Sequence, residues 1–327
     1  MNSAVAVRIH ASQFPENVRR DLLASLRTRR VNHKFHYDSV KQTQKWLALH
    51  EAHSPARYDA DCLSTYDRAF AETAETIKSK SVHVIGLGCG GGQKDSRLLE
   101  LLHKHRKTVS YTPCDVSTAM VLVARRAALA VLPEADCFPF VCDLATANDL
   151  PAVLPNHHPS LVTFFGMIPN FEPRRILPKL AALVRPKDHL LFSANLAPGS
   201  DYTAGMKHIL PQYDNPLTHD WLATFLFDLG IEKRDGKLIF TIETGGLGLQ
   251  RVVTRFHFAR ACRAGVSGES FSFTRGQTIQ LFFSYRYTPE RVQKILQRHG
   301  LQVCRRLMPR PSCASAAASR SLGSPEG

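Results

Sequence analysis

The sequence lacks any apolar run approaching the roughly 20 residues that a membrane-spanning helix needs. Its first residues, MNSAVAVRIHASQF, contain no sustained apolar segment of the kind found in a secretory signal peptide. The eight cysteines form no C-x-x-C pair, which disfavours both a zinc site and a disulfide framework. We therefore expect a cytoplasmic protein without a bound metal or a membrane contact, in which the thiols stay reduced.

Acidic residues are also scarce. The chain has 28 Asp and Glu against 42 Lys and Arg, which gives a formal net charge of +14. Such an excess attracts polyanions, so RNA has to be considered as a partner. However, the arginines crowd the two ends of the chain, and no basic motif interleaved with aromatic residues is present. The pattern favours a basic surface over a nucleic-acid site.

What is present is a glycine-rich stretch, VHVIGLGCGGGQKD, at residues 82–95. The apolar run at 82–87 predicts a buried strand, and an amphipathic segment follows the glycines. Strand, glycine turn and helix are typical of the first part of a nucleotide-binding βαβ unit. Gly86, Gly88 and Gly91 satisfy G-x-G-x-x-G, a pattern that fits both a dinucleotide and S-adenosylmethionine.

Helices and strands alternate after this stretch, which predicts a doubly wound parallel α/β sheet. Three helices are expected before it, beginning near Pro15, Ser39 and Leu63. Further strands of the sheet are expected at residues 108–113, 138–142, 161–165 and 189–194, and a helix at 172–184. The pattern changes after Asn195.

The residues after Asn195 predict an antiparallel α+β insertion, because longer strand-like runs with partial alternation follow a helical segment. The helix is expected at 220–229 and the strands at 237–242, 251–259 and 278–287. A helix beginning at Thr288 and a last strand at 301–307 would return the chain to the main sheet. The remainder is rich in Ser, Ala, Pro and Gly and is expected to be disordered.

Two aspartates help to distinguish between a dinucleotide and S-adenosylmethionine as the cofactor. Asp115 ends the second strand of the sheet and could accept hydrogen bonds from a ribose diol in either case. Asp143 ends the third strand, where a carboxylate could accept a hydrogen bond from the adenine amino group. Gly166 and Asn170, at the end of the fourth strand, would then line a methyl-transfer cleft. Aspartate is also common at strand ends and helix caps, but the arrangement favours S-adenosylmethionine.

Seven motifs in order suggest a family. They are KFHYD at Lys34, SPARYDADCL at Ser54, LGCGGGQKD at Leu87, YTPCDVS at Tyr111, FFGMIPNFEP at Phe164, QYD at Gln212 and SYRYTPERV at Ser284. Over roughly residues 15–307 the chain resembles the histidine-specific S-adenosylmethionine-dependent methyltransferase family. Its best-known members methylate the α-amino group of histidine on the route to ergothioneine, and fungal relatives methylate the amine of a prenylated tryptophan.

The resemblance implies a class I methyltransferase Rossmann-like fold with an inserted α+β substrate domain, and a monomer acting on a small molecule. The expected boundaries are 10–57 and 199–283 for the substrate domain, 58–198 for the S-adenosylmethionine-binding domain, 284–307 for the return to the sheet and 308–327 for the disordered tail.

The resemblance also assigns residues to the cofactor. The positions that correspond to the family's cofactor site are Gly86, Gly88, Gly90, Lys94, Asp115 and Asp143. Gly86 stands where the family carries a glutamate, so that contact is expected to be lost or taken elsewhere. Asn170, Gly166 and Tyr37 match catalytic positions, of which the first two hold the amine that is methylated. Tyr213 matches a tyrosine that helps to hold the substrate carboxylate.

Most of the residues that recognise the histidine imidazole in the family are replaced in this sequence. His53 and Ser54 replace paired tyrosines, and Phe282 replaces a glutamate, whereas Ser284 is retained. Because unpaired polar groups in a pocket are costly, this change predicts an amino acid or related amine with a more apolar side chain, and not histidine itself. Phe282 and His53 also have simple structural interpretations, in core packing and at a helix end. A methyltransferase acting on RNA or protein, an NAD-dependent oxidoreductase and a non-catalytic cofactor-binding protein remain alternatives.

Overall fold

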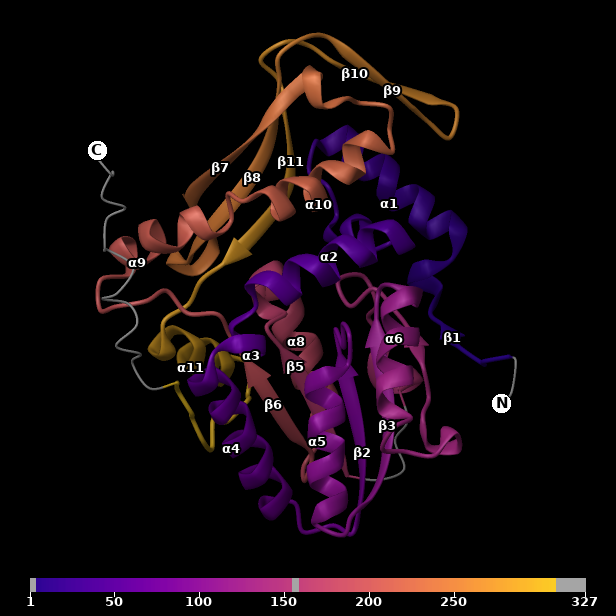
Figure 1. Cartoon of the computed structure of the whole chain (residues 1–327), viewed down its shortest axis with the longest axis vertical. Helices are drawn as coiled ribbons and strands as arrows, with labels where there is room; N and C mark the ends of the chain where they lie inside the picture. The colour runs from indigo at the N-terminus through magenta and orange to yellow at the C-terminus, as the bar shows by residue number, and fades with distance from the viewer. Residues whose placement is uncertain (1–3, 155–158, 310–327) are drawn as a thin grey trace, which may run out of the picture.

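The computed structural model describes residues 4–154 and 159–309 and contains a six-stranded parallel sheet with helices on both faces (Figure 1). The strands lie in the order β1-β4-β3-β2-β5-β6. Their bounds are Arg8–Ile9 (β1), Phe140–Val141 (β4), Thr108–Asp115 (β3), Ser81–Leu87 (β2), Ser160–Phe165 (β5) and His189–Ser193 (β6). The predicted doubly wound sheet is confirmed. The edge strand β1 was not predicted, since two residues carry no periodicity.

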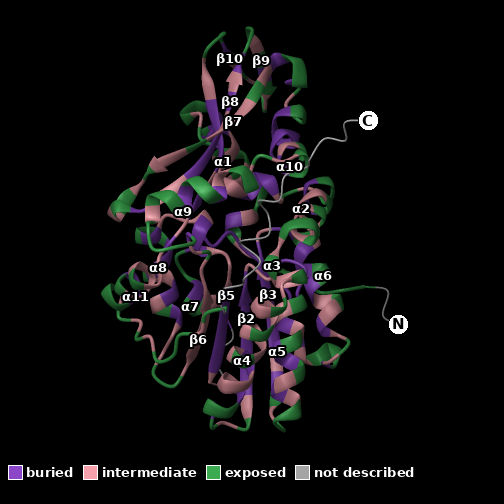
Figure 2. Ribbon diagram, turned by 60° about the vertical axis from the view of Figure 1, so that its left-hand side comes forward, coloured by how far each residue is buried: buried purple, intermediate pink, exposed green. Residues whose placement is uncertain are grey.

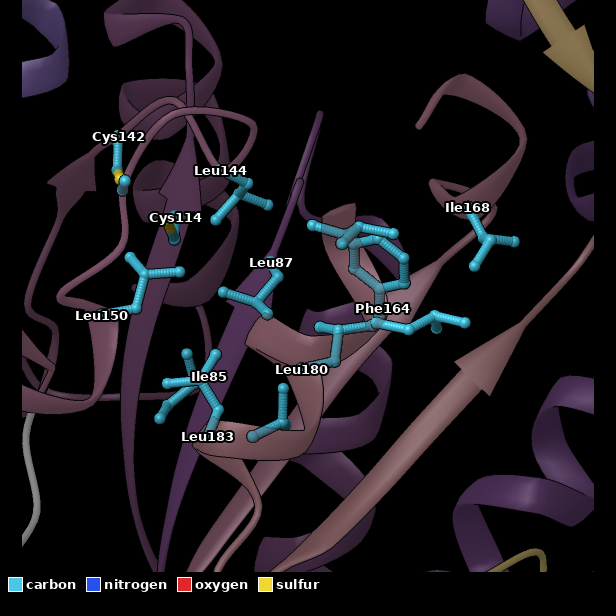
Figure 3. Packing of buried hydrophobic residues seen from close by; sticks show 14 of the residues in the cluster. Ile85, Leu87, Cys114, Cys142, Leu144, Leu150, Phe164, Ile168, Leu180 and Leu183 are labelled. Carbon is cyan, nitrogen blue, oxygen red and sulfur yellow. The ribbon is translucent and has the colours of Figure 1, made fainter. Parts of the chain in front are cut away.

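Strand β2 shows why the sheet has helices on both faces. Val82 and Val84 pack into one apolar cluster with the helices α4, α5 and α6, whereas Ile85 and Leu87 pack into a second cluster with α7, α8 and α11 (Figure 3). A strand buried on both sides reads as a continuous apolar run, as residues 82–87 do. These helices are Ala60–Thr76 (α4), Gln93–Lys104 (α5), Thr118–Ala128 (α6), Leu150–Val153 (α7), Pro173–Leu183 (α8) and Pro289–Arg298 (α11). Figure 2 shows buried residues along β2 and β5.

A second, smaller half lies above the carboxyl ends of the parallel strands (Figure 1). It contains an antiparallel sheet in the order β11-β8-β7 and a β9–β10 hairpin. The strands are Gly236–Thr244 (β7), Gln250–Phe258 (β8), Cys262–Val266 (β9), Glu269–Phe273 (β10) and Thr278–Tyr285 (β11), and the helices are Pro15–Thr28 (α1), Val40–His53 (α2), Pro55–Tyr58 (α3), Tyr202–Ile209 (α9) and Pro216–Phe227 (α10). The antiparallel insertion is therefore confirmed, together with the Ser39 cap of α2.

The N-terminal segment joins this smaller half although some 200 residues separate them in the chain. Arg30 pairs with Gln280 beside β11, and Val31 donates a backbone hydrogen bond to the carbonyl of Gln280. Leu26 and Phe35 belong to one apolar cluster with Trp221 of α10. Both halves of the molecule therefore contain residues from distant parts of the sequence.

One predicted strand is wrong. Residues 301–307 form no strand in the described part of the chain. The chain instead returns through α11, whose Ile295 and Leu296 pack beneath the parallel sheet. Arg305 pairs with Glu72 on the surface of α4, 2.9 Å away, so this stretch is held by side-chain contacts. Most of the predicted disordered tail lies outside the described residues.

Among the described residues, no helix is both long enough and apolar enough to cross a membrane.

Candidate active site

A cavity of about 1560 Å³ opens at the carboxyl ends of the parallel strands and is lined by both halves of the molecule. A single small-molecule site typically occupies about 300–1,000 Å³, so the cavity has room for two ligands side by side. It brings together twelve of the predicted site residues: Tyr37, His53, Gly88, Gly90, Lys94, Asp115, Asp143, Gly166, Asn170, Tyr213, Phe282 and Ser284.

Gly86 is the predicted cofactor residue that is not among those lining the cavity in the described structure. It lies within β2, and a Cβ atom there would run into the carboxylate of Asp95 and lie 2.9 Å from the hydroxyl of Tyr111. The space beside Gly86 is therefore filled by neighbouring side chains, and its assignment to the cofactor stays a prediction.

The glycine turn joins β2 to α5 and forms the floor of the cavity. Gly88 has a positive φ of 66°, and a Cβ atom there would lie 2.5 Å from the side chain of Met167. The positive φ therefore favours glycine, and any larger residue would also displace the Met167 side chain. Trp46 of α2 lies against the turn, 3.2 Å from where a Cβ of Gly90 would be. The smaller half therefore contacts the glycine turn directly.

Asp115 ends β3 beside this turn. Its two carboxylate oxygens accept one backbone hydrogen bond each, from Gly90 and from Ser117, both at 3.1 Å. A carboxylate has about four acceptor positions, so about two remain for a ribose diol. Burial raises the pKa of Asp115, and the backbone hydrogen bonds oppose that rise.

Asp143 follows β4 and is also buried. It accepts hydrogen bonds from the backbone of Ala145 at 2.8 Å and from the hydroxyl of Thr146 at 3.0 Å. The ammonium of Lys34, which is only 2% exposed, lies 3.8 Å from it and 2.6 Å from Asp21. Lys34 therefore links the smaller half to this predicted adenine-binding acid.

Gly166 and Asn170 lie in the loop after β5. The N–H of Gly166 donates to the hydroxyl of Ser193 at 2.9 Å, which leaves its carbonyl as the group able to face an amine. The side-chain amide of Asn170 makes no hydrogen bond within the described part of the chain. Its oxygen can therefore accept a hydrogen bond from a ligand.

Tyr37 lies between the rings of Trp46 and Trp221, with ring centroids 6.0 and 5.5 Å away. Burial, and then the negative charge of Asp115, raise the pKa of Tyr37 well above its usual range. The phenol therefore stays protonated at physiological pH. It can donate a hydrogen bond to a ligand but cannot act there as a general base.

Arg286 is a cavity residue that the sequence analysis did not single out. Its guanidinium donates to the hydroxyl of Tyr213 at 2.8 Å, and that hydroxyl donates to Ser284 at 2.8 Å. Its Nε is buried without a hydrogen-bond partner in the described structure. Strand periodicity could have revealed it, because residues two apart in SYRY share a face with Ser284.

Phe282 is 6% exposed and contacts three aromatic rings. His33 stacks on it at 5.0 Å between ring centroids, and Trp221 and Tyr213 lie 5.6 and 6.4 Å away. Burial lowers the pKa of His33 to about 3, so this imidazole is neutral. Phe282 therefore belongs to the core of the smaller half and also borders the cavity.

His53 is the last residue of α2 and is exposed at the edge of the cavity. Its carbonyl accepts a hydrogen bond from Tyr58 at 3.3 Å.

A family model described as a histidine-specific, SAM-dependent methyltransferase matches residues 18–212, more than half of the chain. The chain belongs to this family. It is accordingly an S-adenosylmethionine-dependent methyltransferase, and the NAD-dependent oxidoreductase interpretation is wrong. The donor set at the glycine turn fits S-adenosylmethionine, since Asp115, Asp143 and Lys94 line one cavity. Tyr213, Phe282, Ser284 and Arg286 lie outside the matched residues.

Solved structures are similar to the chain only at a low level, and no curated protein matches it. The methyltransferase CcbJ from Streptomyces caelestis is 11% identical, with a TM-score of 0.37, over 74% of this chain and 80% of that one. A SAM-dependent methyltransferase from Thiobacillus denitrificans, in complex with S-adenosyl-L-homocysteine, is 16% identical, with a TM-score of 0.35, over 62% and 75%. Similarity at this level gives no information about the substrate.

Proposed function

We propose that this methyltransferase acts on the amine of a free amino acid, or a closely related small molecule, whose side chain is apolar rather than basic. The observation that carries the proposal is the single cavity that holds the Asn170 loop and the Arg286–Tyr213 pair. We also retain the proposed boundaries of the cofactor and substrate domains, and the monomeric state.

Arg286 supplies a positive charge suited to a carboxylate. It forms no ion pair with an acidic residue in the described structure, and its planar guanidinium could hold a carboxylate through two hydrogen bonds. Tyr213 fixes the guanidinium by a hydrogen bond and by its ring, 5.4 Å from the Arg286 carbon Cζ. An acceptor with a free carboxylate next to its amine fits this arrangement.

The wall beside Arg286 explains the expected preference for an apolar side chain. Phe282, Trp221 and the neutral His33 form an aromatic surface. An imidazole or another basic group placed against it would lose its hydration without gaining a charged partner.

In the proposed reaction, S-adenosylmethionine supplies a methyl group bound to a sulfonium. The amine nitrogen forms a bond to that methyl carbon as the carbon–sulfur bond breaks, and a proton passes to water. The chain's task is to align a neutral amine, through the Asn170 amide, the Gly166 carbonyl and the Tyr37 hydroxyl. Such alignment can lower a barrier by up to about 7–11 kcal/mol.

Contacts between the two halves of the molecule at the cavity disfavour an RNA or protein acceptor. Trp46 of the smaller half lies against the glycine turn, and Lys34 reaches Asp143 from the same half. A macromolecular acceptor would need an exposed groove at this point. The basic surface remains the only feature that favours one.

The proposal is tested by incubating the enzyme and S-adenosylmethionine with free amino acids, with their decarboxylated amines, with RNA and with a mixed protein extract, followed by mass spectrometry. We expect methylation of aromatic or aliphatic amino acids, little of histidine, and none of the decarboxylated amines. Efficient methylation of histidine, or of RNA or protein alone, would contradict the proposal, as would cofactor binding without turnover on any acceptor.

A further inference from the structure

A buried carboxylate, that of Asp95, fills the space beside Gly86. Asp95 belongs to the first turn of α5 and is 3% exposed. One of its oxygens accepts a hydrogen bond from the Tyr111 hydroxyl at 2.7 Å, and the other accepts one from Thr163 at 2.8 Å. A Cβ atom at Gly86 would collide with this carboxylate, so an acid at 95 requires glycine at 86.

The hydrogen-bond partners of Asp95 carry no positive charge. Both hydroxyls are neutral, and no lysine, arginine or histidine forms an ion pair with it in the described part of the chain. The neighbouring Lys94 directs its ammonium over the ring of Tyr66, 4.7 Å from the ring centroid. Burying a carboxylate without a cation is costly, which points to a cation supplied by a ligand.

Asp95 and Thr163 both line the cavity next to the glycine turn, and so does Lys94. S-adenosylmethionine carries an amino-acid end with one ammonium and one carboxylate. We propose that Asp95 binds the ammonium of the bound cofactor and Lys94 its carboxylate. The acid that the family carries at position 86 is thereby transferred to position 95, reached from α5 instead of from β2.

This assignment explains three observations together: the glycine at 86, the hydroxyl donors on β3 and β5 that orient the carboxylate, and the opposite charges at adjacent positions of α5. Burial raises the pKa of Asp95, while its hydrogen bonds and Lys94 oppose the rise. A bound ammonium would further favour the charged form. The inference concerns the cofactor alone and does not depend on the acceptor.

The test is calorimetric binding of two probes. S-adenosylhomocysteine has the amino-acid end, and 5′-methylthioadenosine has the same adenosine and thioether without it. Asp95→Asn should weaken S-adenosylhomocysteine binding by about tenfold or more, as expected for a hydrogen bond to a charged group, and leave methylthioadenosine binding nearly unchanged. Glu100→Gln, an exposed acid on the same helix, should change neither.

The exchange of positions gives a second test that does not need the single variant to fold. In Gly86→Glu/Asp95→Thr the acid returns to β2 and the collision with the Asp95 carboxylate is removed, so that only the Tyr111 hydroxyl has to shift. The double variant should bind S-adenosylhomocysteine in preference to methylthioadenosine, as the natural protein does. Equal weakening of both probes by Asp95→Asn, or a folded double variant without that preference, would overturn the inference.

Discussion

Tyr37 illustrates how burial sets the role of a single residue. Its raised pKa means that the hydroxyl stays protonated and donates, so its removal should affect the bound acceptor more than the cofactor. We predict that Tyr37→Phe lowers kcat/KM for the acceptor by about tenfold or more, the usual effect of losing a useful hydrogen bond, while S-adenosylhomocysteine binding stays within twofold. Calorimetry and steady-state kinetics measure the two effects separately. A matching loss of cofactor affinity would assign Tyr37 to the cofactor.

Lys34 is the second residue whose environment leads to a prediction. Its side chain is 2% exposed and pairs with Asp21, which is 14% exposed. Removing one partner of a buried pair leaves the other charge unpaired, so Lys34→Met should reduce the free energy of unfolding by about 3 kcal/mol. Urea denaturation measures this.

A matched control for Lys34 lies close by in the chain. Lys41 pairs with Asp228 on the surface, with side chains 54% and 41% exposed. Surface pairs contribute about 0–1 kcal/mol, so Lys41→Met should have little effect. Equal effects of the two variants would show that burial of the Lys34 pair is unimportant.

At the scale of elements, the contact between residues 33–36 and β11 makes stability depend on pH. His36 is fully buried, and its Nε2 lies 2.7 Å from the carbonyl of Leu281. Burial lowers its pKa from 6.5 to about 4. Between pH 6.5 and 4, His36 is therefore neutral in the folded protein but protonated in the unfolded chain. The free energy of unfolding consequently falls as pH decreases from 6.5 towards 4.

The expected size follows from about 1.4 kcal/mol per pKa unit, which gives a loss of about 3 kcal/mol for His36 over this range. Urea denaturation at several pH values measures it. His36→Gln should flatten the dependence, although His33 contributes in the same direction. His105→Gln, at an exposed position, should leave it unchanged. A stability independent of pH between 6.5 and 4 in the natural protein would refute the prediction.

The sequence predicted elements well where burial imposes a period. Residues 82–87 and 161–165 are buried on both faces and were recognised as strands, and Ser39 and Thr288 were recognised as helix caps. The β9–β10 hairpin was missed, because each strand is only five residues long, although Phe271 and Phe273 alternate with serine in β10. Residues 301–307 resemble a strand in composition, yet they pair with no strand in the described structure.

At the scale of the whole molecule, the site depends on contacts that sequence spacing cannot show. The cavity was predictable where strand ends meet, as with Asp115 and Asp143. The exchange between Gly86 and Asp95 was not, because it involves the distance between a strand and the helix that follows it. The role of Arg286 was not predictable either, because it depends on the hydrogen bond to Tyr213, a distant residue in the sequence.

The contact between the smaller half and the glycine turn can be followed by fluorescence, because the chain has two tryptophans. Trp46 lies against the glycine turn, whereas Trp221 is buried in the smaller half. We predict that S-adenosylhomocysteine changes the emission of Trp46, so that Trp46→Phe abolishes most of the signal and Trp221→Phe retains it. The reverse result would mean that the ligand acts on the aromatic wall around Trp221 and not on the glycine turn.

The central claim is that the acceptor is an amino acid whose carboxylate is held by Arg286. The most direct test is a calorimetric cycle on the enzyme saturated with S-adenosylhomocysteine, using phenylalanine and phenethylamine against the natural protein and Arg286→Met. We predict that the natural protein binds phenylalanine at least about tenfold more tightly than phenethylamine, and that the variant loses this difference. A difference that persists in a folded Arg286→Met protein, or tighter binding of phenethylamine by the natural protein, would contradict the account.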